Sequence, residues 1–478
     1  MNGSVRVVAV ALVVVLAGCA APVADFQDTG QDDTVGEYED PTLTVEGELP
    51  VDANRTLERV ETLLEVDIYP PTVYVEEPFR TSGPIGQDES SFYTVMGVGA
   101  FDPADVDGQL RVGGVASAMQ AVYILPGENA TAPEIEQVLV HEFVHTAQYQ
   151  QNAPQRVLES MPPGHVGTTD GTLALTSLLE GGAVYVSSAY TERYDQPVDS
   201  ERAVLSELYP NASPGTKLAW GPYYHGDRYV DAAVDSPATH WSVYDEPPVT
   251  MAQVLSGEPA SASHSGDPIS TFDLALETTN TTWQADHGAT DVMGEFVLRT
   301  VLETELSAAT SAEAAAGWQY DQLVPVETPN ASATTGYTWA ITFENDTTAT
   351  TFEAATLQYL ENRSEVAMVN GESLEAFENS TASDDQNATW LTDEYAFAVD
   401  RPDERTIVLF AGTESFVDLE ATTATDDGSV SITLEGADTD SGTVQSIAES
   451  TIPESTMPEQ TTAGSSQFGG GEHGVIAP

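Results

Sequence analysis

Apolar residues recur at two distinct periods along this chain. Between Arg55 and Val66 they are spaced three or four positions apart, which predicts an amphipathic helix. The same period predicts helices over residues 133–151, from about 169 onward, over 290–306 and over 351–361. Short apolar runs predict strands at 72–75, 119–125, 337–343, 394–399 and 406–411. From Gly336 the pattern therefore changes to strand, helix and strands.

Residues 1–18 are typical of a lipoprotein signal peptide. Arg6 precedes an apolar run, 7–17, that is too short to span a bilayer. The run ends in Leu16-Ala17-Gly18-Cys19, which resembles a lipobox, the site at which a cysteine thiol is lipidated. The alternative is an ordinary signal peptide with an incidental cysteine. We expect Cys19 to carry a lipid that anchors the protein at the extracellular face of the cell membrane.

The chain is strongly acidic. Its formal net charge is −63, and Lys217 is its only lysine. We expect no nucleic-acid partner, because neutralising phosphates requires basic patches. Similar charge occurs in disordered proteins, but hydrophobic residues make up 41% of this chain, which is enough for a core. We favour a folded protein of an extreme halophile, since molar salt shortens the Debye length to about 3 Å and screens self-repulsion.

The segment from Val138 to Gln148 carries the clearest chemical signal. It contains His141-Glu142-x-x-His145 within an apolar helix. Residues four apart lie on one helix face, so both imidazoles can bind one metal ion. Neutral imidazoles suit Zn²⁺, and Glu142 can take the proton of a water that the metal acidifies. The alternative, that hydrogen bonds on the helix face satisfy both histidines, would leave their spacing around a glutamate unexplained.

A catalytic zinc usually has three protein ligands, and Glu180 is the best third ligand. Gln148 and Gln151 stand where a metzincin has a glycine and its third histidine, so that pattern fails. Glu180 lies 35 residues after His145 as a lone charge in an apolar helical stretch. A buried carboxylate is costly unless it is paired or bound to metal.

Two further carboxylates compete with Glu180 for the third position. Asp170 is the next candidate, although helix capping accounts for it better, and Glu159 is a poorer one in a proline-flanked loop. Glu180 could also face solvent. Gly181 and Gly182, which follow Glu180 directly, would allow its helix to pass close to the zinc helix.

A hydrolase of this kind also needs a hydrogen-bond donor for a developing oxyanion. Pro222-Tyr223-Tyr224-His225-Gly226 is the richest remaining cluster, and we favour the Tyr223 hydroxyl as that donor. In the alternative, both tyrosines pack in the core and His225 lies at the surface.

Together these residues resemble a family of haloarchaeal surface lipoproteins of unassigned function that carry a gluzincin-like signature. The shared features, spread over residues 49–421, are His141-Glu142-x-x-His145 with Gln148 and Gln150, Leu179-Glu180-Gly181 with Ala183, Pro222-Tyr223-x-x-Gly226 before a helix start, Gly294-Glu295, the run from Ala314 to Trp318, Trp339, and Phe352 to Leu360. The wider gluzincin resemblance implies an α+β, zincin-like fold with the zinc helix beside a mixed sheet. It also implies His141, His145 and Glu180 as zinc ligands and Glu142 as the general base.

We therefore expect an acidic, disordered tether at 19–48, a zincin-like domain at 49–335, an α/β portion packed on it at 336–421 and a disordered tail at 422–478. The expected function is a surface zinc metallopeptidase that acts on peptides or proteins. The alternatives are a non-catalytic zinc-binding surface protein and an amidase on cell-surface polymers. The sequence does not reveal the substrate or the oligomeric state.

Overall fold

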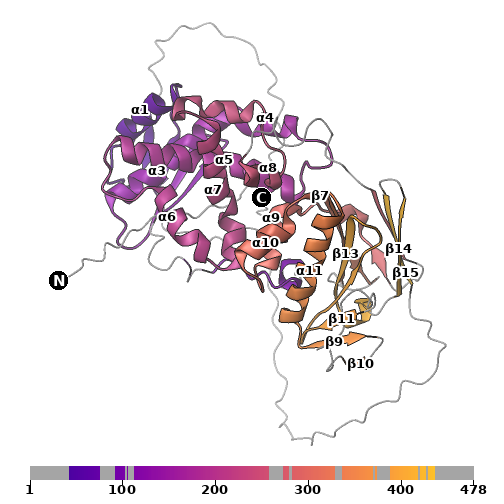
Figure 1. Ribbon diagram of the computed structural model, residues 1–478. Coiled ribbons are helices and arrows are strands. Elements are labelled where there is room, and N and C mark those ends of the chain that lie inside the picture. The colour runs from indigo at the N-terminus through magenta and orange to yellow at the C-terminus, as the bar shows by residue number, and fades with distance from the viewer. Residues whose placement is uncertain are drawn as a thin grey trace, which may run out of the picture.

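The structure of the chain, a computed structural model, describes residues 42–75, 92–102, 105, 112–257, 273–278, 283–328, 336–369, 372–373, 388–417, 420–426 and 429–435. The predicted signal peptide, Cys19 and most of the predicted tether lie outside these residues. No helix within the described ranges is long and apolar enough to cross a membrane. The fold is α+β, as predicted, with a helical region followed by an antiparallel sheet (Figure 1).

A four-stranded mixed sheet lies beside the helical region. Its strand order is β1 (Thr44–Glu46), β2 (Thr72–Val75), β4 (Ala121–Pro126) and β3 (Val112–Ser117). The first three strands are parallel, and β3 pairs antiparallel with β4 at the edge. Alternate residues such as Val73, Val122 and Ile124 are buried, and helix α3 (Ala132–Gln150) packs against β3 and β4.

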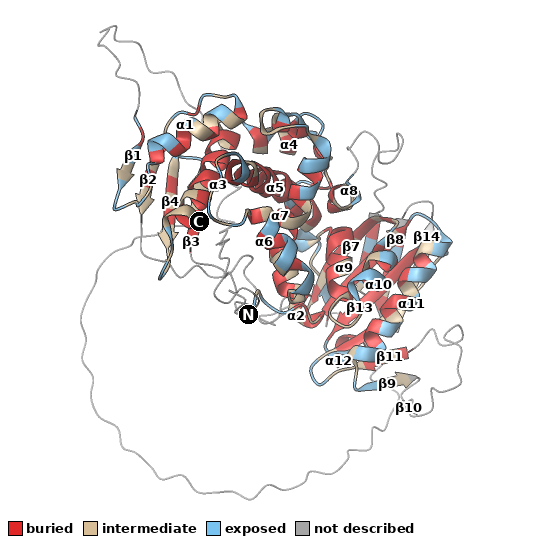
Figure 2. Cartoon of the chain, turned by 60° about the vertical axis from the view of Figure 1, so that its left-hand side comes forward, coloured by how far each residue is buried: buried red, intermediate tan, exposed pale blue. Residues whose placement is uncertain are grey.

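Two long helices are buried on nearly all sides (Figure 2). α3 begins at a capping box formed by Thr131 and Glu134, and all its residues from Gln137 to Gln148 are buried. α5 (Thr169–Arg193) begins after its cap Thr168 and is buried throughout residues 173–188. Apolar residues on every side of a helix place it inside a protein. The surrounding helices are α1 (Ala53–Leu64), α2 (Phe92–Val95), α4 (Ala153–Ser160), α6 (Glu201–Leu208), η2 (Tyr209–Asn211), α7 (Pro214–Ala233), η3 (Pro237–Tyr244) and α8 (Met251–Ser256).

An eight-stranded antiparallel sheet forms the second part of the molecule (Figure 1). In spatial order its strands are β10 (Glu372–Ser373), β9 (Val366–Val369), β11 (Ala388–Leu391), β12 (Ala396–Asp400), β13 (Thr406–Gly412), β8 (Gly336–Phe343), β7 (Trp318–Glu327) and β6 (Gln284–Ala285). Helix α11 (Asp346–Arg363) packs on β8 and β13, while α9 (Gly294–Leu302) contacts α7, α10 (Ala308–Ala315) and β7. The short elements η4 (His287–Ala289) and α12 (Glu414–Val417) complete it.

The structure corrects several predicted elements. The strand predicted at 119–125 is β4, which starts at Ala121, and its edge partner β3 was not predicted. The helix predicted over 290–306 is the shorter α9, and Pro222-Tyr223 lies inside α7 rather than before a helix start. Strands β14 (Glu420–Asp426) and β15 (Ser429–Glu435) pair with each other, and β15 pairs with β5 (Asp273–Thr278), so the predicted disorder from residue 422 is wrong for these strands.

A buried carboxylate on the sheet holds the segment that precedes α9. Asp321 on β7 accepts four hydrogen bonds, from the backbone N–H groups of Met293 and Gly294 at 2.8 Å and from the indole N–H groups of Trp318 and Trp339 at 2.9 Å. Burial raises the pKa of Asp321 to about 6, and the four donors act against that rise. The carboxylate thus fixes the segment that leads into α9.

The same segment holds the start of α5. Asp291 accepts hydrogen bonds from the backbone N–H and the hydroxyl of Thr169, at 2.8 and 2.6 Å. The backbone N–H of Asp170 donates to the carbonyl of Val292, and its carboxylate accepts from the N–H of Met251 at the start of α8. The prediction that Asp170 caps its own helix is therefore wrong, because Thr168 is the cap of α5. Asp170 instead binds the first turn of α8.

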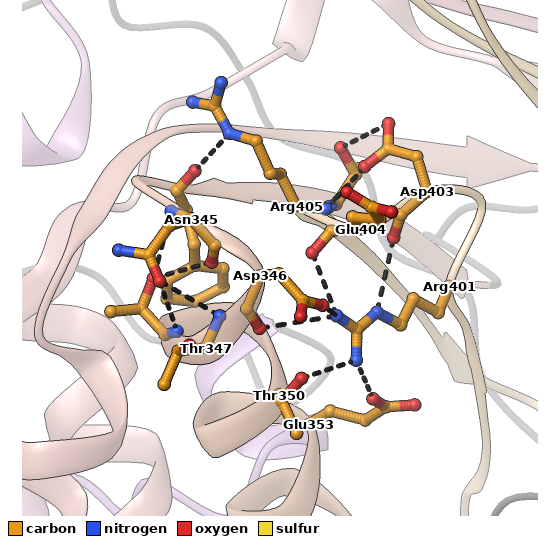
Figure 3. A network of polar contacts seen from close by, with 12 residues as sticks. Asn345, Asp346, Thr347, Thr350, Glu353, Arg401, Asp403, Glu404 and Arg405 are labelled. Carbon is orange, nitrogen blue, oxygen red and sulfur yellow. Dashed lines mark hydrogen bonds and ion pairs between the residues drawn. The ribbon is translucent and has the colours of Figure 1, made fainter.

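Arg401 fastens α11 to the turn between β12 and β13 (Figure 3). Its guanidinium donates to Asp346 at 2.7 Å and to Glu353 at 2.6 Å, both on α11. It also donates to the Thr350 hydroxyl and to the backbone carbonyl of Glu404, within its own turn. A guanidinium can join a helix and a turn in this way because it carries five N–H donors that point in different directions.

Candidate metal centre

Three side chains from the two buried helices converge on one point. His141 and His145, one turn apart on α3, place their Nε2 atoms 3.0 Å from each other. The Glu180 Oε2 atom of α5 lies 3.2 Å from His141 Nε2 and 3.1 Å from His145 Nε2. Within the part of the chain that the structure describes, these three residues form the one group of His, Cys, Asp or Glu that could hold a metal ion.

The outer nitrogen of each imidazole has its own acceptor. His141 Nδ1 lies 3.1 Å from the Glu201 carboxylate, and His145 Nδ1 lies 2.7 Å from the Gln148 Oε1 atom. The Gln148 amide nitrogen donates to the carbonyl of Leu179 and to the Tyr244 hydroxyl, which directs its oxygen to His145. Both rings therefore carry their proton on Nδ1 when neutral, and both Nε2 lone pairs point at the Glu180 carboxylate.

Such a convergence of acceptors requires a positive charge between them. A proton or a metal cation could supply it. Ligand atoms about 2.1 Å from a tetrahedral zinc ion lie about 3.4 Å apart, and the distances of 3.0–3.2 Å found here are close to that spacing. Burial would raise the pKa of Glu180, but His145 and His141 outweigh it and lower the pKa to about 2. The donor set and its spacing fit a divalent transition ion.

Glu142 lies beside this cluster and points at β3. A Cβ atom on Gly114 of β3 would lie 2.4 Å from the Glu142 Oε1 atom, so only glycine leaves room for the carboxylate there. The other oxygen, Oε2, is buried and has no hydrogen-bond partner among the described residues. Burial raises the pKa of Glu142 to about 7, against the opposing effect of His145 and His141. A carboxyl group with this pKa can exchange a proton near neutral pH.

Tyr223 on α7 also lies beside the cluster. Its ring stacks on that of His141, with centroids 6.3 Å apart and planes 22° from parallel. The buried hydroxyl has no hydrogen-bond partner in the described part of the molecule. Burial, and then the charges of Glu180 and Glu142, raise the Tyr223 pKa well above its usual value. The hydroxyl therefore stays protonated and can donate a hydrogen bond to a ligand.

Close packing of α5 on α7 brings Glu180 and Tyr223 together. A Cβ atom on Gly181 would lie 2.1 Å from the backbone of Gly226, and one on Gly226 would lie 2.0 Å from the carbonyl of Ser177. Gly181 was expected to allow an approach to the zinc helix, but it faces α7 instead. Its neighbour Gly182 does face α3, since a Cβ there would meet Gln148 at 3.0 Å.

The other predicted candidates lie elsewhere. Asp170 precedes Glu180 by ten residues on α5, about 15 Å along the helix. Glu159 is exposed and lies in α4 rather than in a loop. His225 is half-buried rather than at the surface, and its Nε2 atom pairs with the Tyr209 hydroxyl at 3.1 Å.

Two contributors to the centre were not identified from the sequence. Glu201 begins α6, and nothing in its local pattern distinguishes it from the other acidic residues of the chain. Gln148 was noted as part of the motif but was given no role. Its position three residues after His145 on a buried helix is a local signal that could have indicated the contact.

Comparisons with known proteins bear on the second part of the molecule. Residues 281–421 match a family model described as a domain of unknown function, DUF8575. The matched range contains the eight-stranded sheet and helices α9 to α11, and it leaves out α3 and α5 with their candidate metal ligands. No curated protein and no solved structure matches the chain significantly.

Proposed function

We propose that the protein is a zinc-dependent metallopeptidase with a zincin-like centre. The proposal rests chiefly on the convergence of His141 Nε2, His145 Nε2 and Glu180 Oε2 within 3.2 Å, next to a buried carboxylate oxygen without a partner among the described residues. A zinc site that serves stability alone usually has four protein ligands. Three ligands with an adjacent acid are typical of a centre that carries out chemistry.

His141, His145 and Glu180 would hold the ion. When bound, zinc supplies a Lewis acid that makes water more acidic and polarises a carbonyl group. Glu142 would accept a proton and then return it to the leaving amine, which its pKa of about 7 permits near neutral pH. The Tyr223 hydroxyl would donate a hydrogen bond to the carbonyl oxygen of the substrate as negative charge develops on it.

The edge strand β3 supports a peptide as the substrate. Among the described strands, β3 pairs only with β4, and we propose that an extended peptide pairs with its other edge. Gly114 of this strand lies against Glu142. A peptide paired with β3 would therefore lie beside the acid that has to act on it.

Surface anchoring through Cys19 is also part of the proposal, on the basis of the Leu16-Ala17-Gly18-Cys19 sequence. Replacing the cysteine, in Cys19→Ser, should move the protein from the membrane fraction to the medium. An unchanged membrane fraction would contradict the lipid anchor and would leave the metal centre unaffected.

The decisive experiment compares the full chain with Glu142→Gln in the salt in which it folds. We expect both to bind one zinc ion per chain, and we expect the variant to cleave casein or peptides roughly a hundred- to ten-thousandfold more slowly. Glu159→Gln, an exposed carboxylate on α4, is the matched control and should behave like the unchanged protein. Zinc binding with no cleavage by any of the three proteins would instead favour a non-catalytic zinc-binding protein.

A further inference from the structure

We propose that Glu201 is a positioning residue that orients His141 for metal binding. This inference rests on the proposed zinc centre. Glu201 is 1% exposed, yet it lies on a short surface helix, α6, outside both helices that carry the candidate ligands. Its Oε2 atom lies 3.1 Å from His141 Nδ1 and accepts a further hydrogen bond from the Ser187 hydroxyl of α5.

The helix that carries Glu180 does not supply this acid itself. One turn after Glu180, α5 carries Val184, which is fully buried in an apolar cluster. The ring of His141 would lack an acceptor for its Nδ1 proton without a residue from another element. Helix α6 supplies this acceptor through Glu201, which lies 60 positions after His141 in the chain.

Several contacts hold α6 in the required place. Gln137, one turn before His141 on α3, donates to the carbonyl of Asp199 at 3.0 Å, just before α6. The N–H of Arg202 donates to the Ser188 hydroxyl of α5. Its guanidinium forms two 2.8 Å hydrogen bonds with the Asp227 carboxylate on α7. Glu201 is thus fixed by contacts to all three helices that build the centre.

The chemical effect follows from the proton on Nδ1. A carboxylate that accepts this proton keeps the Nε2 lone pair free and the ring aligned, and it makes the imidazole a stronger donor to a metal. His145 has only a neutral amide, Gln148, at the same atom. The two rings therefore have different acceptors at Nδ1: the carboxylate of Glu201 for His141 and the neutral amide of Gln148 for His145.

The test measures the affinity of the full chain for Zn²⁺ by competition with a chromophoric chelator, after metal removal. We expect Glu201→Ala to weaken binding about 10- to 100-fold, and Glu201→Gln, which keeps a neutral acceptor, to weaken it less. The visible spectrum of the Co²⁺-loaded protein should shift in both variants, because the ring that binds the ion is no longer aligned. Thermal unfolding of each metal-free variant checks that it is folded.

Glu134→Gln is the matched control. Glu134 is also a buried carboxylate of α3, and it accepts a hydrogen bond from the backbone N–H of Thr131 in the capping box. We expect its Zn²⁺ affinity and Co²⁺ spectrum to match those of the unchanged protein. Should Glu201→Ala fail to fold, the nearly isosteric Glu201→Gln decides alone.

Two outcomes separate this inference from the proposed function. Wild-type affinity and an unchanged Co²⁺ spectrum in Glu201→Gln and in folded Glu201→Ala would overturn the role of Glu201 and leave the zinc centre standing. Equal losses in Glu201→Gln and Glu134→Gln would overturn it as well. Absence of Zn²⁺ binding by the unchanged protein would overturn the proposed function itself.

Discussion

Two buried carboxylates, one in each part of the molecule, differ in what surrounds them. Asp321 in the eight-stranded sheet is fully buried and accepts hydrogen bonds from four N–H groups. Glu142 in the helical region is 3% exposed, and one of its oxygens has no partner among the described residues. Burying an acceptor without a donor is costly, so natural structures rarely keep one without a reason. Asp321 thus has the full set of partners expected of a structural carboxylate, whereas Glu142 has the unpartnered oxygen that its proposed role as a base requires.

The polar networks of the two parts support the same distinction. Arg401 in the sheet region donates to side chains and carbonyls that all belong to α11 and its own turn (Figure 3). Around His141 and His145, by contrast, the hydrogen bonds hold the outer ring nitrogens and leave the inner ones facing a carboxylate. The first network is complete within its own residues, and the second surrounds a position that a metal ion could occupy.

Removing a candidate ligand tests whether a metal ion binds between His141, His145 and Glu180, and it should change the protein most. Glu180→Ala removes one of three candidate ligands. Zinc binds to sites with four protein ligands with about 10–16 kcal/mol, which is up to about 4 kcal/mol per ligand. We therefore expect the Zn²⁺ affinity to fall by roughly a thousandfold. Chelator competition measures the change. An affinity within tenfold of the unchanged protein would show that the ion, if bound, is held elsewhere.

Amide substitutions of Asp321 and Glu142 should differ in their effect on the free energy of unfolding. In Asp321→Asn an amide NH₂ group replaces one carboxylate oxygen, so two of the four N–H donors lose their acceptor. We expect this change to lower the free energy of unfolding by roughly 3 kcal/mol. Glu142→Gln should change it by less than about 1 kcal/mol, because the oxygen that becomes an amide nitrogen has no donor to lose. Urea or thermal unfolding of metal-free protein measures both. Equal losses in the two variants would contradict the different roles assigned to Asp321 and Glu142.

A smaller effect is expected where α5 crosses α7. Gly181→Ala would bring a methyl group to 2.1 Å from the Gly226 backbone, and the resulting overpacking should cost about 2 kcal/mol of unfolding free energy. Because Glu180 is its neighbour, Zn²⁺ affinity should fall as well. Gly99→Ala is the control, since nothing lies within 4 Å of the added carbon, and it should leave both quantities unchanged.

The smallest expected effect is a difference in the response to acid. Burial lowers the pKa of His240 to about 4 and of His225 to about 3, so their contribution is complete above pH 6.5 and is lost as the pH falls through those values. Asp321 has a pKa raised to about 6, so its contribution has the opposite sign and grows as the pH falls from 6 towards 3.8.

We therefore expect His240 and His225 to lower stability between pH 6.5 and 4, while protonation of Asp321 and of Glu142, whose pKa values are raised, acts in the opposite direction. Melting temperatures between pH 7 and pH 4.5 measure the sum. His240→Gln removes a titrating ring and should make the plot of melting temperature against pH flatter. Asp321→Asn should make that plot steeper. The opposite changes in slope would contradict the assignment.

Much of the centre could be predicted because its key spacing is local. His141 and His145 lie one helical turn apart, and any helix through them brings their rings to the same face. Glu180 was recognisable as a charge in an otherwise apolar stretch, and Tyr223 as the aromatic residue of a Pro-Tyr cluster. Their burial in α5 and α7 agrees with those patterns, while their catalytic roles stay predictions.

The pairing of the two imidazoles, with an acid between them, followed from local sequence alone, because an α-helix repeats every 3.6 residues whatever the rest of the chain does. Three other contacts depend on how the elements pack: Glu201 meets His141, Gly114 leaves room for Glu142, and Gly181 faces α7. These partners lie in other elements, and the packing of those elements sets which side chains meet. No local period encodes that packing, because it depends on the shapes of many side chains at once.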